Sequence, residues 1–246
     1  MFGSSIVQLV SSIMAALITG TALIITQLLK NKRVSVLWII IFMVLGALGG
    51  YYLGETLAQS LEFKITDDFS NKSRYWDQAN IETASHKSKS YIVNGKYYWE
   101  VTGFDLVGAT IEPATPILSN FIYSIDIKQI KGSDDITYGI LFRSNEASGW
   151  YFFAIRNDGY FQLMFSPPSG EMKWLIPWTK SSVISNKNNL KVIAQEDVIR
   201  LYINNSLVTS ISDRSSTYGE IGIYVGVREG DNTAFEIDNF DLEILK

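Results

Sequence analysis

Two long uncharged stretches at the N-terminus constrain this chain more than any other feature. Residues 1–29 and 34–54 contain no charged side chain, whereas three of the four residues between them are basic. An α-helix rises about 1.5 Å per residue, so about 20 apolar residues cross the roughly 30 Å hydrocarbon core of a bilayer. The pattern therefore predicts two transmembrane helices, at about residues 5–29 and 34–54, joined by a turn at residues 30–33.

The basic turn also predicts the orientation of these helices. Short loops rich in lysine and arginine stay on the cytoplasmic side of a membrane, and Lys30, Lys32 and Arg33 form such a loop. We therefore expect a two-pass protein of the cell membrane with both termini on the extracytoplasmic side. The first stretch lacks the basic start of a signal peptide and is too long for one, so we expect it to be retained.

Small residues recur at every fourth position on one face of each predicted helix. Such residues let helix backbones approach closely within a bilayer. They are Ser12, Ala16 and Gly20 in the first helix and Gly46, Gly50 and Gly54 in the second. Two alternatives stay open: the two faces pack against each other as a hairpin, or they dock against other integral membrane subunits.

The composition beyond residue 54 excludes several kinds of site. This segment contains 18 Lys and Arg and all 25 Asp and Glu, which leaves a net charge of about −7. A nucleic-acid partner is not expected, because phosphate binding requires clustered positive charge. The chain has no cysteine and one histidine, His86, so disulfides, catalytic triads and multi-histidine metal sites are excluded.

Short runs of alternating polarity, separated by turn residues, replace the continuous apolar pattern after the second stretch. This period is typical of β-strands, so we predict an all-β antiparallel sandwich at residues 66–246, after a short stalk at residues 55–65. Strands are expected near residues 91–93, 96–102, 121–129, 136–143, 149–156, 160–165, 189–194, 198–203, 206–211, 219–227 and 235–245. Two-residue hairpin turns are expected at Asn94-Gly95, Asp158-Gly159 and Asn204-Asn205.

The last predicted strand changes the side on which its apolar residues fall. Phe235 and Ile237 share one parity, whereas Phe240 and Leu242 share the other. Both pairs can face one core only if an extra residue is inserted between them. We therefore predict a β-bulge near Asp238-Asn239.

A series of short segments within residues 66–246 follows the pattern of one family. They include Asp67-Asp68-Phe69-Ser70, Asn94-Gly95-Lys96-Tyr97, Tyr138 to Arg143, Gly149 to Phe153, Leu201 to Asn204, Gly219 to Gly222 and Ile237 to Phe240. Together they resemble the concanavalin A-like (laminin G-like) jelly-roll domains, closest to bacterial groups related to 3-keto-glycoside hydrolases and concanavalin-like glucanases. The resemblance implies a jelly-roll sandwich, a fold that serves lectins, glucanases, adhesion modules and spacers alike.

Aromatic and polar residues on neighbouring strands predict a carbohydrate-binding platform. If Phe161, Leu163 and Phe165 face the core, the alternate residues of that strand face outward. Aromatic faces flanked by fixed polar groups are the usual components of sugar sites. The candidate ligand-binding residues are Arg143, Trp150, Arg156, Tyr160, Gln162, Trp174 and Trp178. The alternative is that these rings only cover the sheet.

One acidic motif is similar to a catalytic sequence. Glu236-Ile-Asp238-Asn-Phe-Asp241 resembles the Glu-x-Asp-x-x-Glu motif of family-16 glycoside hydrolases, which hydrolyse with two carboxyl groups. Its last residue is Asp instead of Glu, and its strand resembles the closing strand of the family, so we expect a structural role and no catalytic residues. A structural calcium ion at Asp68 and Asp238 stays open beside a turn-capping role of Asp68, and no other cofactor is expected.

The leading hypothesis is a non-enzymatic binding module, anchored in the lipid bilayer, that presents a jelly-roll domain outside the membrane. Its expected partners are polysaccharides or other envelope components. The alternatives are an accessory subunit of a larger membrane complex, docked through its two helices, and a cell-surface glycosidase.

Overall fold

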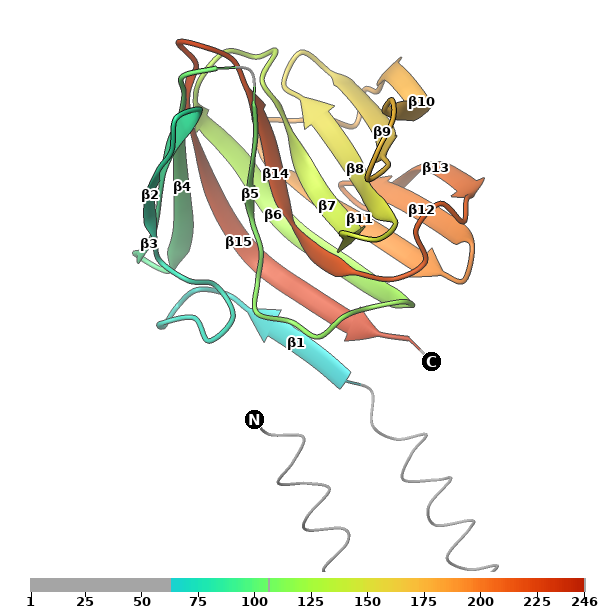
Figure 1. Cartoon of the computed structure of the whole chain (residues 1–246). Helices are drawn as coiled ribbons and strands as arrows, with labels where there is room; N and C mark the ends of the chain where they lie inside the picture. Colours follow the sequence, from blue (N-terminus) through green and yellow to red (C-terminus); the bar gives the residue numbers. More distant parts are fainter. Residues whose placement is uncertain (1–62, 106, 246) are drawn as a thin grey trace, which may run out of the picture. The chain divides into compact units, whose positions relative to one another are not determined.

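The computed structural model describes residues 63–105 and 107–245, in which all regular structure is β-strand (Figure 1). Within these residues, no helix has the length and apolar character needed to cross a bilayer. The two predicted transmembrane helices, with the six small residues of their packing faces, lie outside the described residues. The prediction of an all-β antiparallel fold is confirmed for the described part of the chain.

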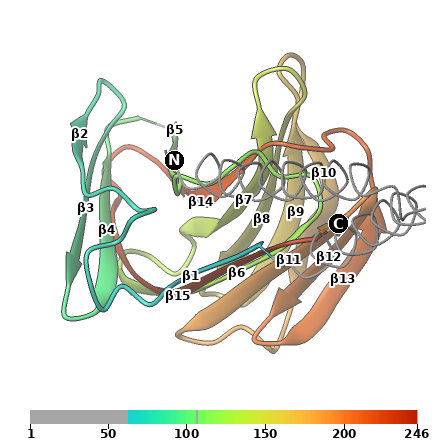
Figure 2. The ribbon, with the colours of Figure 1, turned by 90° about the horizontal axis from the view of Figure 1, so that it is seen from below.

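The strands form two antiparallel sheets (Figure 1). The nine-stranded sheet contains, in spatial order, β13 (Ser206–Ser212), β12 (Val198–Ile203), β11 (Asn188–Gln195), β6 (Phe121–Lys131), β15 (Asn232–Ile244), β4 (Lys96–Gly103), β3 (His86–Val93) and β2 (Asn80–Glu82), with β1 (Phe63–Asp67) paired to β15. The six-stranded sheet contains, in order, β10 (Lys173–Lys180), β9 (Tyr160–Ser166), β8 (Gly149–Arg156), β7 (Thr137–Asn145), β14 (Glu220–Val227) and β5 (Val107–Ile111). Figure 2 shows β1 running beside β15.

The core lies between the two sheets and follows from the alternation of residues along each strand. Successive strand residues point to opposite faces. Strand β6 buries every second residue from Phe121 to Ile127. Strand β7 is buried throughout from Tyr138 to Arg143, and its alternate residues Tyr138, Ile140 and Phe142 belong to this core. The unit Glu62–Lys246 is compact by itself and contains this core. We therefore expect it to fold without the preceding residues.

The predicted bulge in the last strand is confirmed. Asp238 pairs with Asp126, whereas Asp241 pairs with Ser124, so β15 carries one residue more than β6 in this interval. Asn239 has a left-handed backbone with φ of 50°. The apolar residues on both sides of the bulge belong to the same core.

The hairpin predictions are correct at two of three turns. Both residues of Asn94-Gly95 and of Asn204-Asn205 are left-handed, as a two-residue turn of this type requires. The prediction at Asp158-Gly159 is wrong. Arg156 pairs with Tyr160, which leaves a three-residue loop in which only the last residue is left-handed. This is the type I turn plus glycine bulge that serves three-residue hairpins.

Four observed strands were not predicted. Strands β2, β5 and β10 lie at sheet edges, where alternation is weak because no more than part of the strand is buried. Strand β1 begins at Phe63, so residues 63–65 of the predicted stalk are paired with β15. Residues 55–62 lie outside the described residues.

Candidate functional site

The side of the six-stranded sheet that faces away from the core is itself apolar. On β8, Tyr151, Phe153 and Ile155 point into the main core, which leaves Phe152 and Ala154 on the other side. Both of these residues are nevertheless buried. An antiparallel sheet usually has one buried and one solvated face, so this second apolar face distinguishes the sheet.

A second hydrophobic cluster covers this outer side. Its buried members are Phe152, Ala154 and Met164, and Trp150, Trp178 and Tyr224 pack against them. The ring centroids of Phe152 and Tyr224 are 4.1 Å apart, and those of Trp150 and Tyr224 are 5.5 Å apart. We call these six residues, together with Gln162 and Arg156, the outer aromatic face.

A glycine on the edge strand β5 makes room for Tyr224. Residues Gly139 on β7 and Thr110 on β5 are its direct partners across the sheet. A Cβ atom at Gly108 would lie 2.2 Å from the Tyr224 ring, so this ring occupies the space that a side chain there would take. Burial raises the pKa of Tyr224.

A hollow of about 330 Å³ opens beside these rings. It is lined by Gly108, Thr110, Glu112, Leu141, Ser144, Trp150 and Tyr224. Partial burial and the adjacent Glu220 carboxyl raise the pKa of Glu112. The hollow therefore combines two aromatic walls, two hydroxyl groups and the Glu112 carboxyl.

At the other end of the face, Arg156 joins two rings. Its guanidinium lies 4.5 Å from the centroid of the Trp178 ring and 5.4 Å from that of Tyr160. It also forms an ion pair with Asp158, with 2.6 Å between Nη2 and Oδ2. Its charge is thus already neutralised, and it holds the Trp178 indole in place by a cation–π contact.

The structure brings six of the seven predicted ligand-binding residues to this one side of the sheet. Trp150 and Arg156 lie on β8, Tyr160 and Gln162 on β9, and Trp174 and Trp178 on β10. Trp174 is the most exposed of the large apolar side chains among them, at 58%. The placement follows from the predicted alternation, which the pairing of β8, β9 and β10 extends across three strands (Figure 1).

The seventh residue, Arg143, is buried instead of exposed, which corrects the prediction. Its Nη2 atom donates to the carbonyl oxygens of Ser119 and Glu196, both at 2.8 Å, and Nη1 donates to that of Ser216 at 3.4 Å. The register of β7 shifts at this position, where Arg143 has a φ of 48°. This bulge turns a side chain that alternation places outward into the interior.

The acidic motif of β15 lies on the nine-stranded sheet, and each of its carboxylates has a partner. Tyr98 donates to Glu236 at 3.3 Å, and Lys64 pairs with Asp241 at 2.8 Å. Lys96 forms an ion pair with Asp238. These contacts fit the predicted structural role.

The suggested calcium ligands do not come together. Asp238 is bound by the Lys96 ammonium, whereas Asp68 caps a turn by accepting from the Ser70 amide at 3.0 Å. Among the described residues, no group of three or more His, Asp or Glu side chains is arranged to hold a metal ion. The turn-capping alternative for Asp68 therefore matches the geometry.

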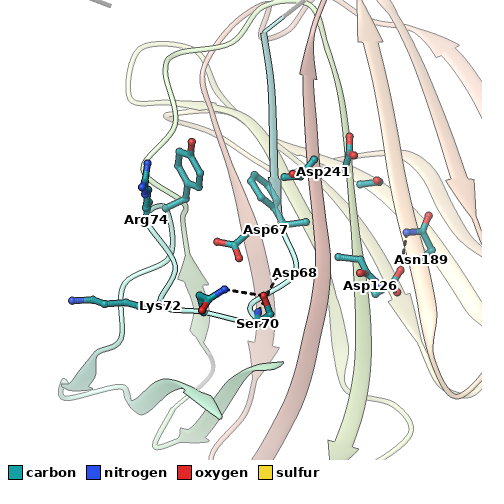
Figure 3. Close-up of a pocket in the computed structure, with 14 residues that line it drawn as sticks. Asp67, Asp68, Ser70, Lys72, Arg74, Asp126, Asn189 and Asp241 are labelled. Atoms are coloured by element: carbon teal, nitrogen blue, oxygen red, sulfur yellow. Dashed lines mark hydrogen bonds between the residues drawn. The ribbon is translucent and has the colours of Figure 1, made fainter. Parts of the chain in front are cut away.

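A larger and more polar hollow, of about 680 Å³, lies where the segment after β1 crosses β15 and β6 (Figure 3). Its carboxylates are already engaged. Asp126 accepts from Asn189 and Asn239, each at 2.8 Å, and pairs with Lys187 at 2.9 Å. Burial of Asp126 opposes its ionisation, but these donors outweigh it and lower its pKa. The contacts are those of a structural network.

Sequence reasoning missed Phe152 and Tyr224 of the outer aromatic face and Glu112 of the hollow beside it. The sequence contains one signal for Tyr224. This residue lies between Gly222 and Gly226, and all three positions have the same parity along the strand. A single aromatic residue between glycines of the same parity indicates that its ring has space on that side of the strand.

Comparison with known proteins supports the fold. No protein-family model and no curated protein matches the sequence. The catalytic domain of an endo-1,3-β-glucanase (laminarinase) from Thermotoga petrophila RKU-1 is similar, with a TM-score of 0.55, 12% identity and coverage of 76% of this chain and 100% of that domain. A β-glucanase from Bacillus licheniformis has a TM-score of 0.52 and 11% identity, with coverage of 74% of this chain and 98% of that one.

A carbohydrate-binding module from Bacillus subtilis is also matched, with a TM-score of 0.45, 19% identity and coverage of 67% of this chain and 93% of that module. The two glucanases place the described residues in the class of concanavalin-like jelly-roll sandwiches. At these identities the similarity shows the fold, and the function has to be argued from the site.

Proposed function

We propose that residues 62–246 form a glycan-binding domain without catalytic activity, which the two N-terminal helices hold on the outside of a membrane. The observation that carries this proposal is the outer aromatic face. Flat rings beside a few polar groups in a shallow hollow are the combination that sugar sites use, since sugar rings offer both apolar faces and hydroxyl groups.

The chemistry of the carboxyl groups supports binding over hydrolysis. Glycosidases keep their two carboxyl groups about 5–9.5 Å apart, on either side of the scissile bond. At the hollow, burial and the neighbouring Glu220 carboxyl instead raise the pKa of Glu112, so these two carboxyl groups are adjacent and do not stand on either side of a bond. On β15, Asp238 and Asp241 are held by lysines.

Titration calorimetry of residues 62–246 against a panel of polysaccharides tests the proposed site. Replacing Trp150 or Trp178 by Ala removes a ring from the outer aromatic face, and we expect each change to weaken binding by about tenfold, equivalent to roughly 1.4 kcal/mol. Tyr202→Ala is the matched control, because Tyr202 lies on the outer side of the nine-stranded sheet. The proposal fails if the wild-type domain binds no polysaccharide, or if the control variant loses as much affinity as the others.

The membrane topology has a separate test. Protease added to intact spheroplasts should digest the C-terminal domain if it lies outside the membrane. Digestion that occurs only after lysis would place the domain in the cytoplasm and remove external glycans as ligands.

A further inference from the structure

One buried polar atom on the outer aromatic face has no hydrogen-bond partner. Gln162 is only 5% exposed, and its Oε1 atom is buried without a donor. A buried carbonyl oxygen that loses its water without gaining a donor destabilises the folded state. Such groups are rare in native proteins, and each one calls for an explanation.

The register shows which side chain covers this amide. Gln162 lies between Ala154 on β8, which has no atoms beyond Cβ, and the Pro177-Trp178 pair on β10. The indole of Trp178 reaches the cluster formed by Ala154 and its neighbours. The register therefore points to this indole as the side chain from β10 that covers the amide, and the Arg156 guanidinium lies over its ring.

The cover belongs to a strand that can move at low cost. Strand β10 is the edge of its sheet, and its pairing with β9 shifts twice, on both sides of Ile176. Pro177 has no amide hydrogen to give to a ladder. Moving the indole therefore breaks few backbone hydrogen bonds.

We propose that Gln162 is the buried anchor of a saccharide site, in which the Trp178 indole turns outward and a sugar hydroxyl donates to Oε1. This inference rests on the proposed function and adds the group that fixes the sugar's orientation. The displaced indole then offers its face to the sugar ring. The ligand supplies the hydrogen bond that Oε1 of Gln162 lacks in the domain alone.

Two charge arrangements on this side of the sheet, one on β8 and one beside the hollow, favour an uncharged glycan. The Arg156 guanidinium is already paired with Asp158, so no free cation faces the amide from β8. The Glu112 and Glu220 pair at the other end of the face is acidic and repels uronic acids or phosphates. The ligand class is thus a neutral hexose or pentose polymer.

A thermal measurement tests the unmade hydrogen bond without any ligand. Gln162→Met keeps the side-chain length but removes the unpartnered oxygen, and we expect the Tm of residues 62–246 to rise by at least about 2 °C. Gln129→Met is the matched control. Gln129 donates to the Ser133 carbonyl at 2.9 Å and accepts from Asn157 at 2.9 Å, so its replacement should lower the Tm. A fall in Tm for Gln162→Met would overturn the inference.

The same substitution in a Trp178→Ala background tests the cover. Without the indole, water reaches the amide, so Gln162→Met should no longer raise the Tm. An undiminished rise in this background would show that another group buries Gln162, and would overturn the role of Trp178.

Binding of neutral hexaoses, with a hexagalacturonate as the charged comparison, completes the test. We expect Gln162→Met to weaken binding of a neutral hexaose by at least tenfold although the variant is more stable. Unchanged affinity would overturn the anchor and leave the proposed function standing. Binding of the galacturonate alone would overturn the ligand class, and a wild-type domain that binds no saccharide would remove the proposed function as well.

Discussion

Replacing Arg143 by Met should destabilise the domain strongly, because this buried side chain is the donor for three backbone carbonyl groups. Those of Ser119, Glu196 and Ser216 come from three separate loops, and all accept from its guanidinium. Met fills a similar volume but donates no hydrogen bond. The substitution thus leaves the carbonyl groups facing a thioether.

The magnitude follows from the number of acceptors. A buried acceptor without a partner costs about 1–3 kcal/mol, so three of them cost at least about 3 kcal/mol. The guanidinium of Arg143 has no carboxylate in direct contact, so its burial carries a desolvation cost that the Met variant avoids. The net loss of stability therefore stays near the lower bound of about 3 kcal/mol. For a domain of this size each kcal/mol shifts the Tm by about 2–4 °C. We expect a decrease of about 6–12 °C.

The assay is thermal unfolding of residues 62–246, followed by circular dichroism. Arg156→Met is the matched control, since Arg156 lies on the adjacent strand but pairs with Asp158 at the surface. Partly exposed ion pairs contribute up to about 1 kcal/mol, so the control should lose no more than about 4 °C. If both variants melt within 2 °C of the wild type, the carbonyl groups do not depend on Arg143 and the argument is refuted.

Two further predictions concern pH. The donors around Asp126 lower its pKa, so its stabilising effect is present above the ordinary pKa of 3.8 and is lost as the pH falls through the lower folded value. Asp126→Asn should therefore lower the Tm at pH 7 by several degrees. Equal Tm values for the variant and the wild type at pH 7 would contradict this. The pKa of Glu112 is raised, so its contribution is present below the ordinary value of 4.5 and is lost as the pH rises through the folded value. Glu112→Gln should raise the Tm at pH 7 and leave it unchanged at pH 3, whereas a lower Tm at pH 7 would show that the carboxylate pair is stabilising.

The alternation of residues was sufficient to predict the central strands and most of the candidate face. Strands such as β8 and β12 have the predicted bounds, because each buries a regular row of apolar side chains. The edge strands β2, β5 and β10 were missed for the opposite reason. All three residues of β2 are exposed, so nothing in their sequence distinguishes them from a loop.

Tyr224 and Glu112 were missed because they come together beside the hollow through strand pairings that alternation does not reveal. Strand β14 lies between β7 and β5, so it brings residues from distant parts of the chain beside Trp150 on β8. Alternation determines the side of the sheet on which a residue lies. The order of strands determines its neighbours, and that order depends on long-range packing.

The two bulges show why one irregularity was predictable and the other was not. At Asp238-Asn239 the apolar residues on either side change parity. A regular strand would turn some of them away from the core, so the change of parity indicates an inserted residue. After Arg143 the strand continues with Ser144 and Asn145, which carry no apolar pattern to reveal a change of side. A charged residue near a strand end can therefore be buried without any signal in the alternation. The same reasoning favours Gln162 over Arg143 as the polar residue of the site, since apolar residues of unchanged parity flank it on both sides.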